Sequence, residues 1–216
     1  MDKKYMSDTY FIGALLAVVG GYLDAYTYIA RGGVFANAQT GNIVLFGLNL
    51  AKGNVKAAVC YLVPIFAFAI GIVWAEGVKI KYKSSRFHWR QITLFIEAMG
   101  LFCAAILHSD MLANTIVSFV CAVQVQSFRK VNGNVLATTM CTGNLRTGTE
   151  ALFYGVINKD KSKIAKGVQY YGIILFFVVG AAIGTAVTAR LNTASVFCPC
   201  GALVFCLLLL SVKREF

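Results

Sequence analysis

Long apolar stretches dominate this sequence and leave only short connections between them. A helix needs about 20 mostly apolar residues, or about 17 to 25 allowing for tilt, to cross the hydrocarbon core of a bilayer. Six segments of the chain meet this requirement: residues 10–30, 57–77, 92–109, 111–128, 168–190 and 194–212. The sequence therefore predicts an all-α integral membrane protein in which residues 1–216 form a single membrane domain.

The composition excludes a soluble globular protein. The chain is 58% hydrophobic and 13% charged, whereas soluble domains are about 45 to 50% apolar and about 25% charged. The net charge of +11 could indicate a nucleic-acid partner, but in a membrane protein it is better explained by basic loops on the cytoplasmic side. We therefore expect the lipid bilayer as a partner and no nucleic acid.

Two further segments, 34–51 and 136–157, are long enough to cross a membrane but are polar. Each contains the tripeptide Thr-Gly-Asn, first at residues 40–42 and again at residues 142–144. Glycine accepts backbone angles that other residues avoid. We therefore expect both segments to be broken at this tripeptide.

The two tripeptides indicate an internal duplication. They lie 102 residues apart, and about the same offset relates the apolar segments 92–109 and 194–212. Recurrence at a fixed offset is the sequence signature of a repeat. The repeated halves would be residues 10–109 and 111–212.

The distribution of Lys and Arg favours six crossings, because short cytoplasmic loops are enriched in these residues. If all eight segments cross, the two sides carry 10 and 9 of them. If segments 34–51 and 136–157 each enter and leave on one face, the counts become 16 and 4, with both termini in the cytoplasm. A seven-crossing arrangement, in which only 34–51 crosses, gives 15 and 5 in the opposite orientation and stays open.

Three crossings in each half place the second half upside down relative to the first. The predicted fold is thus about six transmembrane helices and two broken, re-entrant segments in a 3+3 inverted repeat, with the breaks meeting near the midplane. Non-helical backbone at that depth is tolerated only where it is buried in protein or lines a watery cavity. Inverted repeats with such breaks are typical of transporters.

The first helix contains a carboxylate, Asp24, well inside the apolar segment. A charged side chain at that depth costs about 2.5 to 3.5 kcal/mol on insertion scales and usually faces a partner or a polar path. Asp24 is either a proton or cation site, or a carboxylate satisfied by backbone N–H groups of a broken segment. The counterpart of Asp24 at the 102-residue offset is the neutral Gln126. Gln126 could belong to the same site or make only interhelical hydrogen bonds. We expect Gly20 and Gly21 to allow close helix packing.

The residues at the two breaks have the chemistry of a turn or a helix start. A short helix after each break would direct its positive end to the midplane, which suits an anion or a polar solute. Helix capping alone would also explain these residues. The candidate binding residues at the breaks are Thr40, Gly41, Asn42, Thr142, Gly143 and Asn144.

Three further charged residues within the predicted membrane segments are candidate site residues. Arg146 and Glu150 are spaced i, i+4 and can form an ion pair on one helical face. Glu97 is a candidate gate, although its side chain could instead reach the interface.

Motifs for catalysis and metal binding are missing from the sequence. It contains no G-x-S-x-G, H-E-x-x-H or G-x-x-x-x-G-K motif, so we expect no enzymatic activity. Its seven cysteines do not have metal-site spacing, and we expect no metal and no cofactor.

Four stretches of the sequence carry a family resemblance: GGYLDAYTY, FANAQTGN, QVQSFRKVNGN and TTMCTGNLRTG. With these motifs the chain resembles, over essentially its whole length, the YoaK family of small bacterial multi-pass membrane proteins. The resemblance implies a bacterial cytoplasmic (inner) membrane protein with about six spans, and it implies no substrate.

These features favour a small-solute membrane transporter or channel with a polar midplane site between the halves. Asp24 is the group available for proton coupling, and the expected ligand is a small polar or anionic solute. The alternative is a non-transporting membrane scaffold or sensor that acts by assembly with partners. A homodimer is compatible with both.

Overall fold

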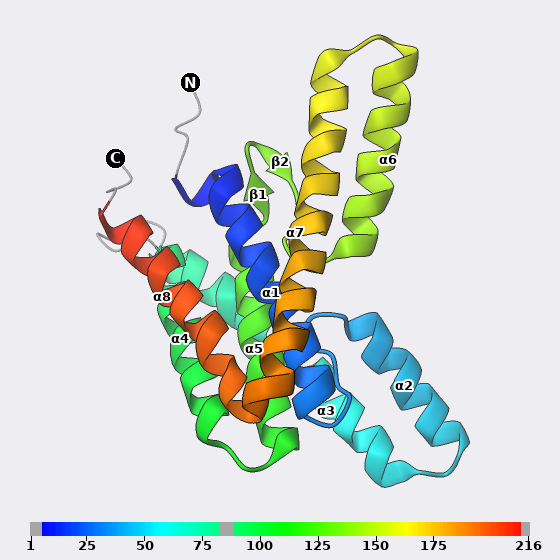
Figure 1. The fold of residues 1–216 in the computed structure, drawn as a ribbon, viewed down its shortest axis with the longest axis vertical. Coiled ribbons are helices and arrows are strands. Elements are labelled where there is room, and N and C mark those ends of the chain that lie inside the picture. The colour runs from blue at the N-terminus through cyan, green and yellow to red at the C-terminus, as the bar shows by residue number, and fades with distance from the viewer. Residues whose placement is uncertain (1–5, 83–88, 213–216) are drawn as a thin grey trace.

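The computed structural model describes residues 6–82 and 89–212, and almost all of them are helical (Figure 1). The all-α prediction is confirmed. A two-stranded β-hairpin and two short 3-10 helices, η1 and η2, complete the fold. The elements are η1 Met6–Asp8, α1 Tyr10–Ala30, α2 Gln39–Ala51, α3 Val55–Tyr82, α4 Trp89–Ile106, α5 Asp110–Ser127, β1 Lys130–Val131, β2 Asn134–Val135, α6 Cys141–Ile157, α7 Lys161–Leu191, η2 Asn192–Val196 and α8 Phe197–Val212.

Membrane-spanning character is concentrated in four stretches of the described residues. They are 10–30, 55–82, 89–106 and 161–211, the last of which contains α7, η2 and α8. The predicted segment 111–128 forms α5, but polar side chains such as Asn114 and Gln124 lower its hydropathy below that of these four stretches. Six crossings therefore remain a prediction, while the length and apolar composition of these helices support a membrane protein.

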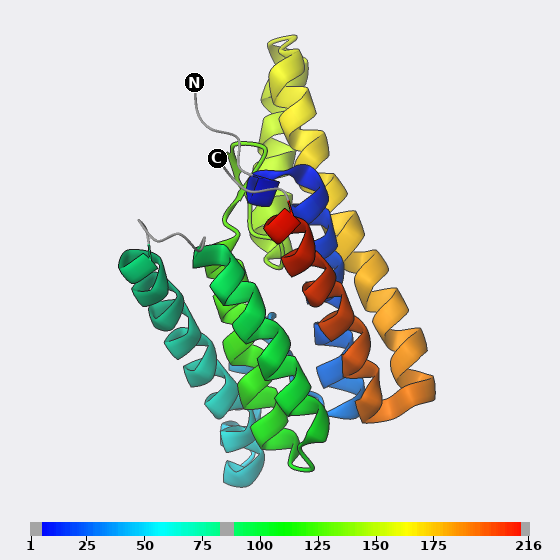
Figure 2. The same ribbon diagram turned by 90° about the vertical axis from the view of Figure 1, so that its left-hand side faces the viewer.

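The centre of the bundle is formed by α1 and α5, which are buried along most of their length. α1 packs against α7, α5 packs against α3 and α4, and α4 packs against α8. Turned by 90°, the molecule shows α3 at one edge and α7 at the other, with α4, α5 and α8 between them (Figure 2). The apolar core between these helices includes Leu16, Leu23, Leu101, Val117 and Leu203.

Glycines set the distance between α1 and α7. A Cβ atom at Gly21 would lie 2.0 Å from the carbonyl oxygen of Phe177, and one at Gly180 would lie 2.1 Å from that of Val18. A Cβ atom at Gly20 would likewise meet the methyl group of Thr139. The prediction of close helix packing is confirmed for Gly21, where a larger side chain would push the backbone of α7 away; Gly20 instead leaves room for the side chain of Thr139.

The polar segments form two helical hairpins, because α2 packs on α3 and α6 packs on α7. α2 begins near the middle of the molecule and runs down to the α2–α3 turn, whereas α6 begins near the middle and runs up to the α6–α7 turn (Figure 1). The two turns, at residues 52–54 and 158–160, therefore lie at opposite ends of the molecule. Segment 34–51 returns to the end at which α1 finishes, as a re-entrant segment does.

Candidate functional site

A cavity of about 650 Å³ lies where α2 and α6 begin, and we call it the central cavity. Its volume is within the range of about 300 to 1,000 Å³ that is typical of small-molecule sites. Its lining comes from α1, α3 and α7 and from the starts of α2 and α6 with the residues that precede them. The lining includes Asp24, Tyr28, Phe35, Asn37, Thr40, Phe68, Thr139, Met140, Thr142, Gly143 and Phe177.

Both helices that start at this cavity lack a side-chain cap. Ala38 precedes α2 and Met140 precedes α6, and neither side chain can accept a hydrogen bond from the helix. In contrast, α1, α5 and α7 are capped by Thr9, Ser109 and Asp160. The first N–H groups of a helix have no intrahelical acceptor and carry partial positive charge. At the start of α2 the N–H groups of Gln39 and Gly41 donate to the carbonyls of Asn37 and Ala38. The N–H groups that remain available to a ligand are therefore mainly those of residues 141–143, at the start of α6.

The asparagine of each Thr-Gly-Asn holds the backbone just before its helix. Asn42 accepts a hydrogen bond from the Phe35 N–H at 3.0 Å and donates one to the Phe35 carbonyl at 2.7 Å. Asn144 donates to the Ala137 carbonyl at 2.6 Å, which is the same seven-residue reach. The break is thereby placed before the tripeptide, and the tripeptide itself forms the first helical turn. The interpretation that Thr-Gly-Asn interrupts the helix is wrong.

We call these hydrogen bonds of Asn42 and Asn144 to backbone the asparagine clamps. They keep two predicted binding residues away from the cavity surface. Asn42 and Asn144 are buried and do not line the central cavity. Gly41 also lies outside the lining, because it faces the ring of Phe35. Thr40, Thr142 and Gly143 do line the cavity, as predicted for a site at the breaks.

Asp24 lines the central cavity and also binds backbone. Its side chain is 6% exposed, and its Oδ1 accepts a hydrogen bond from the Asn37 N–H at 2.6 Å. The N–H groups of Ala36 and Ala38 face the same carboxylate. Both sequence interpretations therefore have a geometric basis: the carboxylate is held by a broken segment, and it is the one charged side chain in the described lining.

Two buried polar side chains of the lining lack a full set of partners. The Asn37 Nδ2 donates to the Gly20 carbonyl at 3.1 Å. Its Oδ1 and the Thr139 Oγ1 have no hydrogen-bond partner among the described residues. A buried polar atom without a partner costs about 1 to 3 kcal/mol. Both atoms are buried, so they stay unsatisfied in this arrangement of the lining.

Asn37 and Thr139 were missed by the sequence reasoning, although a signal was present. They lie 102 residues apart and each stands five residues before the asparagine of Thr-Gly-Asn. Extending the repeat alignment upstream of the tripeptides would have paired them. The apolar residues of the lining, such as Phe68 and Phe177, carry no comparable signal, because only the packing of α3 and α7 brings them to the cavity.

A second cavity of about 300 Å³ adjoins the first, and Phe68 and Met140 line both. It is lined by Gln126 and Arg129 near the end of α5. The Gln126 side chain donates to the Glu76 carboxylate. The residue that the repeat relates to Asp24 therefore lies in the second cavity and does not join the central one.

The three other charged candidates lie outside both cavities. Glu97 is fully buried in α4, and neither of its carboxylate oxygens has a hydrogen-bond partner in the part of the chain that the structure describes. Arg146 and Glu150 are exposed on α6 and form no ion pair with each other, contrary to the prediction. Because α6 packs mainly against α7, both side chains remain exposed on its other face.

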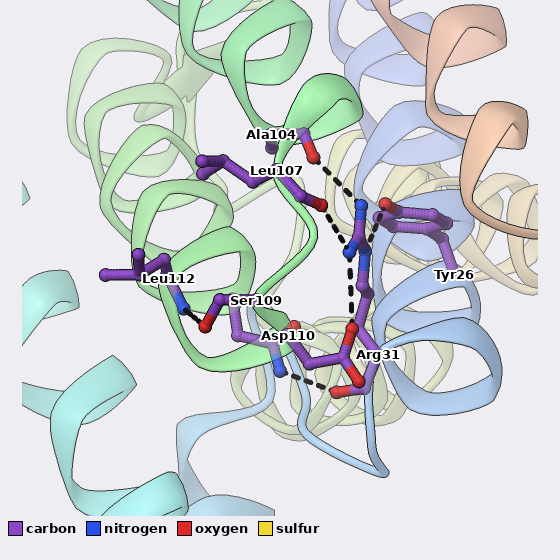
Figure 3. Close-up of polar contacts among 8 residues, drawn as sticks. Tyr26, Arg31, Ala104, Leu107, Ser109, Asp110 and Leu112 are labelled. Carbon is purple, nitrogen blue, oxygen red and sulfur yellow. Dashed lines mark hydrogen bonds and ion pairs between the residues drawn. The ribbon is translucent and has the colours of Figure 1, made fainter.

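Arg31 is a buried charge that the sequence reasoning did not select. Its side chain is 2% exposed and its guanidinium donates to the carbonyls of Ala104 and Leu107, both at 2.9 Å, at the end of α4 (Figure 3). It also bonds the Tyr26 hydroxyl at 2.8 Å and forms an ion pair with Asp110 at 3.2 Å. Arg31 thus fixes the end of α1, from which the chain runs to the break before α2.

Comparison with known proteins gives one result. The family model described as "Protein of unknown function (DUF1275)" matches residues 12–210. The chain belongs to the DUF1275 family. The match includes both cavities and both Thr-Gly-Asn helix starts of this DUF1275 protein. No curated protein and no solved structure matches the chain significantly.

Proposed function

We propose that this DUF1275 protein is a transporter or channel for a small polar solute and that the central cavity is its binding site. One observation carries the proposal: two helix starts without a side-chain cap border a single cavity that is also lined by the Asp24 carboxylate. Broken helices whose ends meet inside the membrane are typical of secondary transporters.

The proposed architecture is the 3+3 inverted repeat with six crossings. The pairing of helices supports it, because the α1–α7 contact has its counterpart in the contact between α5 and α3. The α2–α3 hairpin likewise has its counterpart in the α6–α7 hairpin. The two asparagine clamps also support the repeat, because each joins an asparagine side chain to the carbonyl seven residues before it.

The proposed location is the bacterial inner membrane with both termini in the cytoplasm. The orientation rests on the 16 to 4 distribution of Lys and Arg. The location rests on the narrower likeness to the YoaK proteins, which is consistent with the DUF1275 family.

The proposed path runs through both cavities. The central cavity takes its α1 lining from residues 24–29, and the second cavity takes its α5 lining from residues 125 and 126. α1 and α5 run in opposite directions (Figure 1), so the two cavities extend toward opposite ends of the molecule. Phe68 and Met140 stand between them as the barrier that a solute must pass.

Within this path Asp24 supplies the charge and Thr40 and Thr142 supply hydroxyl groups. Proton coupling through Asp24 is part of the proposal, because a proton on this carboxylate changes the charge that the solute meets. Glu97 takes no part in the path, since it lines neither cavity.

Flux through purified protein in liposomes tests the proposal. Candidate solutes are scanned with and without a pH gradient, on the unaltered chain and on Asp24→Asn and Thr142→Val. Both variants are expected to reduce flux at least tenfold, whereas Thr115→Val, which removes a hydroxyl outside both cavities, is expected to leave it unchanged. Flux that is indifferent to both cavity variants, or no flux of any solute, would favour the scaffold or sensor alternative.

A further inference from the structure

The central cavity has two chemically different polar sides. On the α1 side lies an acceptor, the Asp24 carboxylate. On the α6 side lie donors, namely the Thr142 hydroxyl and the first N–H groups of the helix, those of residues 141–143. A ligand that satisfies both sides must present a donor to α1 and an acceptor to α6.

The charges of the two sides differ for a structural reason. Asp24 accepts N–H groups of the segment just before α2, so its negative charge offsets the positive end of that helix. The repeat places Gln126 at the corresponding position before α6, but this side chain is neutral and binds Glu76 in the second cavity. The positive end of α6 is therefore not offset by a carboxylate in the lining. The cavity is electrically dipolar, with its negative pole at Asp24 and its positive pole at α6.

The rest of the lining is apolar and aromatic. Phe35, Phe68 and Phe177 form walls between the two poles, together with Tyr28 and Met140. Aromatic walls bind an apolar group well, while the polar groups fix its orientation. The occupant therefore has an apolar body as well as two polar ends.

We infer that the solute is a small zwitterion with an apolar body, of which an apolar α-amino acid is the simplest form. This inference rests on the proposed function and names its substrate class. The ammonium group lies at Asp24, and the carboxylate lies at the start of α6 beside Thr142. The apolar side chain packs against the phenylalanines.

The two simpler ligand classes each leave one pole unmatched. An anion without an amine finds its donors at α6 but leaves the negative charge of Asp24 without a positive charge on the ligand. An amine without a carboxylate binds Asp24 but leaves the N–H groups of α6 and the Thr142 hydroxyl without an acceptor. Sites that hydrogen-bond a group reject analogues that lack it, because the buried polar atoms then stay unpaired.

Calorimetry with three matched ligands on the purified full chain tests the inference. The ligands are L-phenylalanine, 3-phenylpropionate, which lacks the amine, and phenethylamine, which lacks the carboxylate; L-leucine and L-tryptophan with their corresponding analogues extend the series. We expect each amino acid to bind at least about tenfold more tightly than either analogue, since a hydrogen bond to a charged group is worth that factor or more.

Two variants test which group of the ligand binds at Asp24 and which binds at the start of α6. Asp24→Asn is expected to reduce the affinity for phenylalanine to that for phenylpropionate and to leave the latter unchanged. Thr142→Val is expected to weaken both carboxylate-bearing ligands and to leave phenethylamine unchanged. Melting curves of both variants verify folding, and the ligand series on the unaltered chain decides the question if Asp24→Asn does not fold.

The possible failures are distinguishable. If phenylpropionate or phenethylamine binds as tightly as the amino acids, or if no amino acid of the series binds, the zwitterion inference is wrong. The proposed function stands in those cases when liposomes show flux of another solute that depends on Asp24 or Thr142. When no solute shows such flux, both are wrong.

Discussion

The contact between α1 and α7 gives a stability prediction whose size follows from the structure. A Cβ atom at Gly180 would lie 2.1 Å from the carbonyl oxygen of Val18, whereas ordinary contacts begin at 3.4 Å. The obstacle is backbone, so it cannot rotate away, and the two helices must separate by about 1 Å. Overpacking of this kind costs about 1 to 3 kcal/mol, while alanine regains up to about 1 kcal/mol of helix propensity. We expect Gly180→Ala to lower the free energy of unfolding by about 1 to 2 kcal/mol.

Gly201→Ala is the matched control, because Gly201 lies in α8 and a Cβ atom there would meet no heavy atom within 4 Å. It is expected to leave stability unchanged or to raise it by up to about 1 kcal/mol. Unfolding of both variants is followed by circular dichroism in the same detergent micelles. Because Phe177 lies at this contact and also lines the central cavity, Gly180→Ala should also weaken ligand binding. Equal stability of the two variants would refute the reasoning that backbone contact at Gly180 sets the helix distance.

Three further substitutions test the parts that position the site. Asn144→Ala removes the hydrogen bond to the Ala137 carbonyl and is expected to cost about 1 to 3 kcal/mol; Asn158→Ala, at an exposed turn position, should cost almost nothing in the same thermal denaturation. Arg31→Met removes charged hydrogen bonds to two carbonyls at the end of α4 and is expected to cost about 3 kcal/mol or more, measured by chemical unfolding in micelles. Thr139→Val replaces a hydroxyl that has no partner among the described residues, so it should leave the melting temperature unchanged or raise it; a lowered melting temperature would show that the hydroxyl is already satisfied.

The sequence predicted the features that depend on local composition and on the repeat. Apolar runs of about 20 residues predicted the helices, and the paired tripeptides correctly located two interruptions near the middle of the molecule. The exact position of each interruption was wrong by a few residues, since the asparagine side chain reaches back seven positions and moves the break upstream. Such a reach depends on the loop conformation, which no residue pattern specifies.

The side chains that complete the cavity could not be predicted in the same way. Phe68 and Phe177 reach it because α3 and α7 cross the starts of α2 and α6, and the crossing depends on glycine contacts between distant helices. The predicted pair Arg146 and Glu150 failed for a related reason. Spacing along α6 brings both residues to one face, but α6 packs mainly against α7 and leaves that face open.

The two halves hold their backbone breaks in the same way, but only the first half has a carboxylate at its break. This difference in charge bears on function. Asn42 and Asn144 make the same clamp, and Ala38 and Met140 both leave a helix start uncapped. If the charges also matched, two equal positive helix ends would face each other across the cavity, and a symmetric anion would suit it. Asp24 prevents this, because its carboxylate offsets the end of α2 and no carboxylate in the lining offsets that of α6. The polarity of the cavity, and with it the class of ligand that we propose, therefore follows from a position at which the halves are not alike.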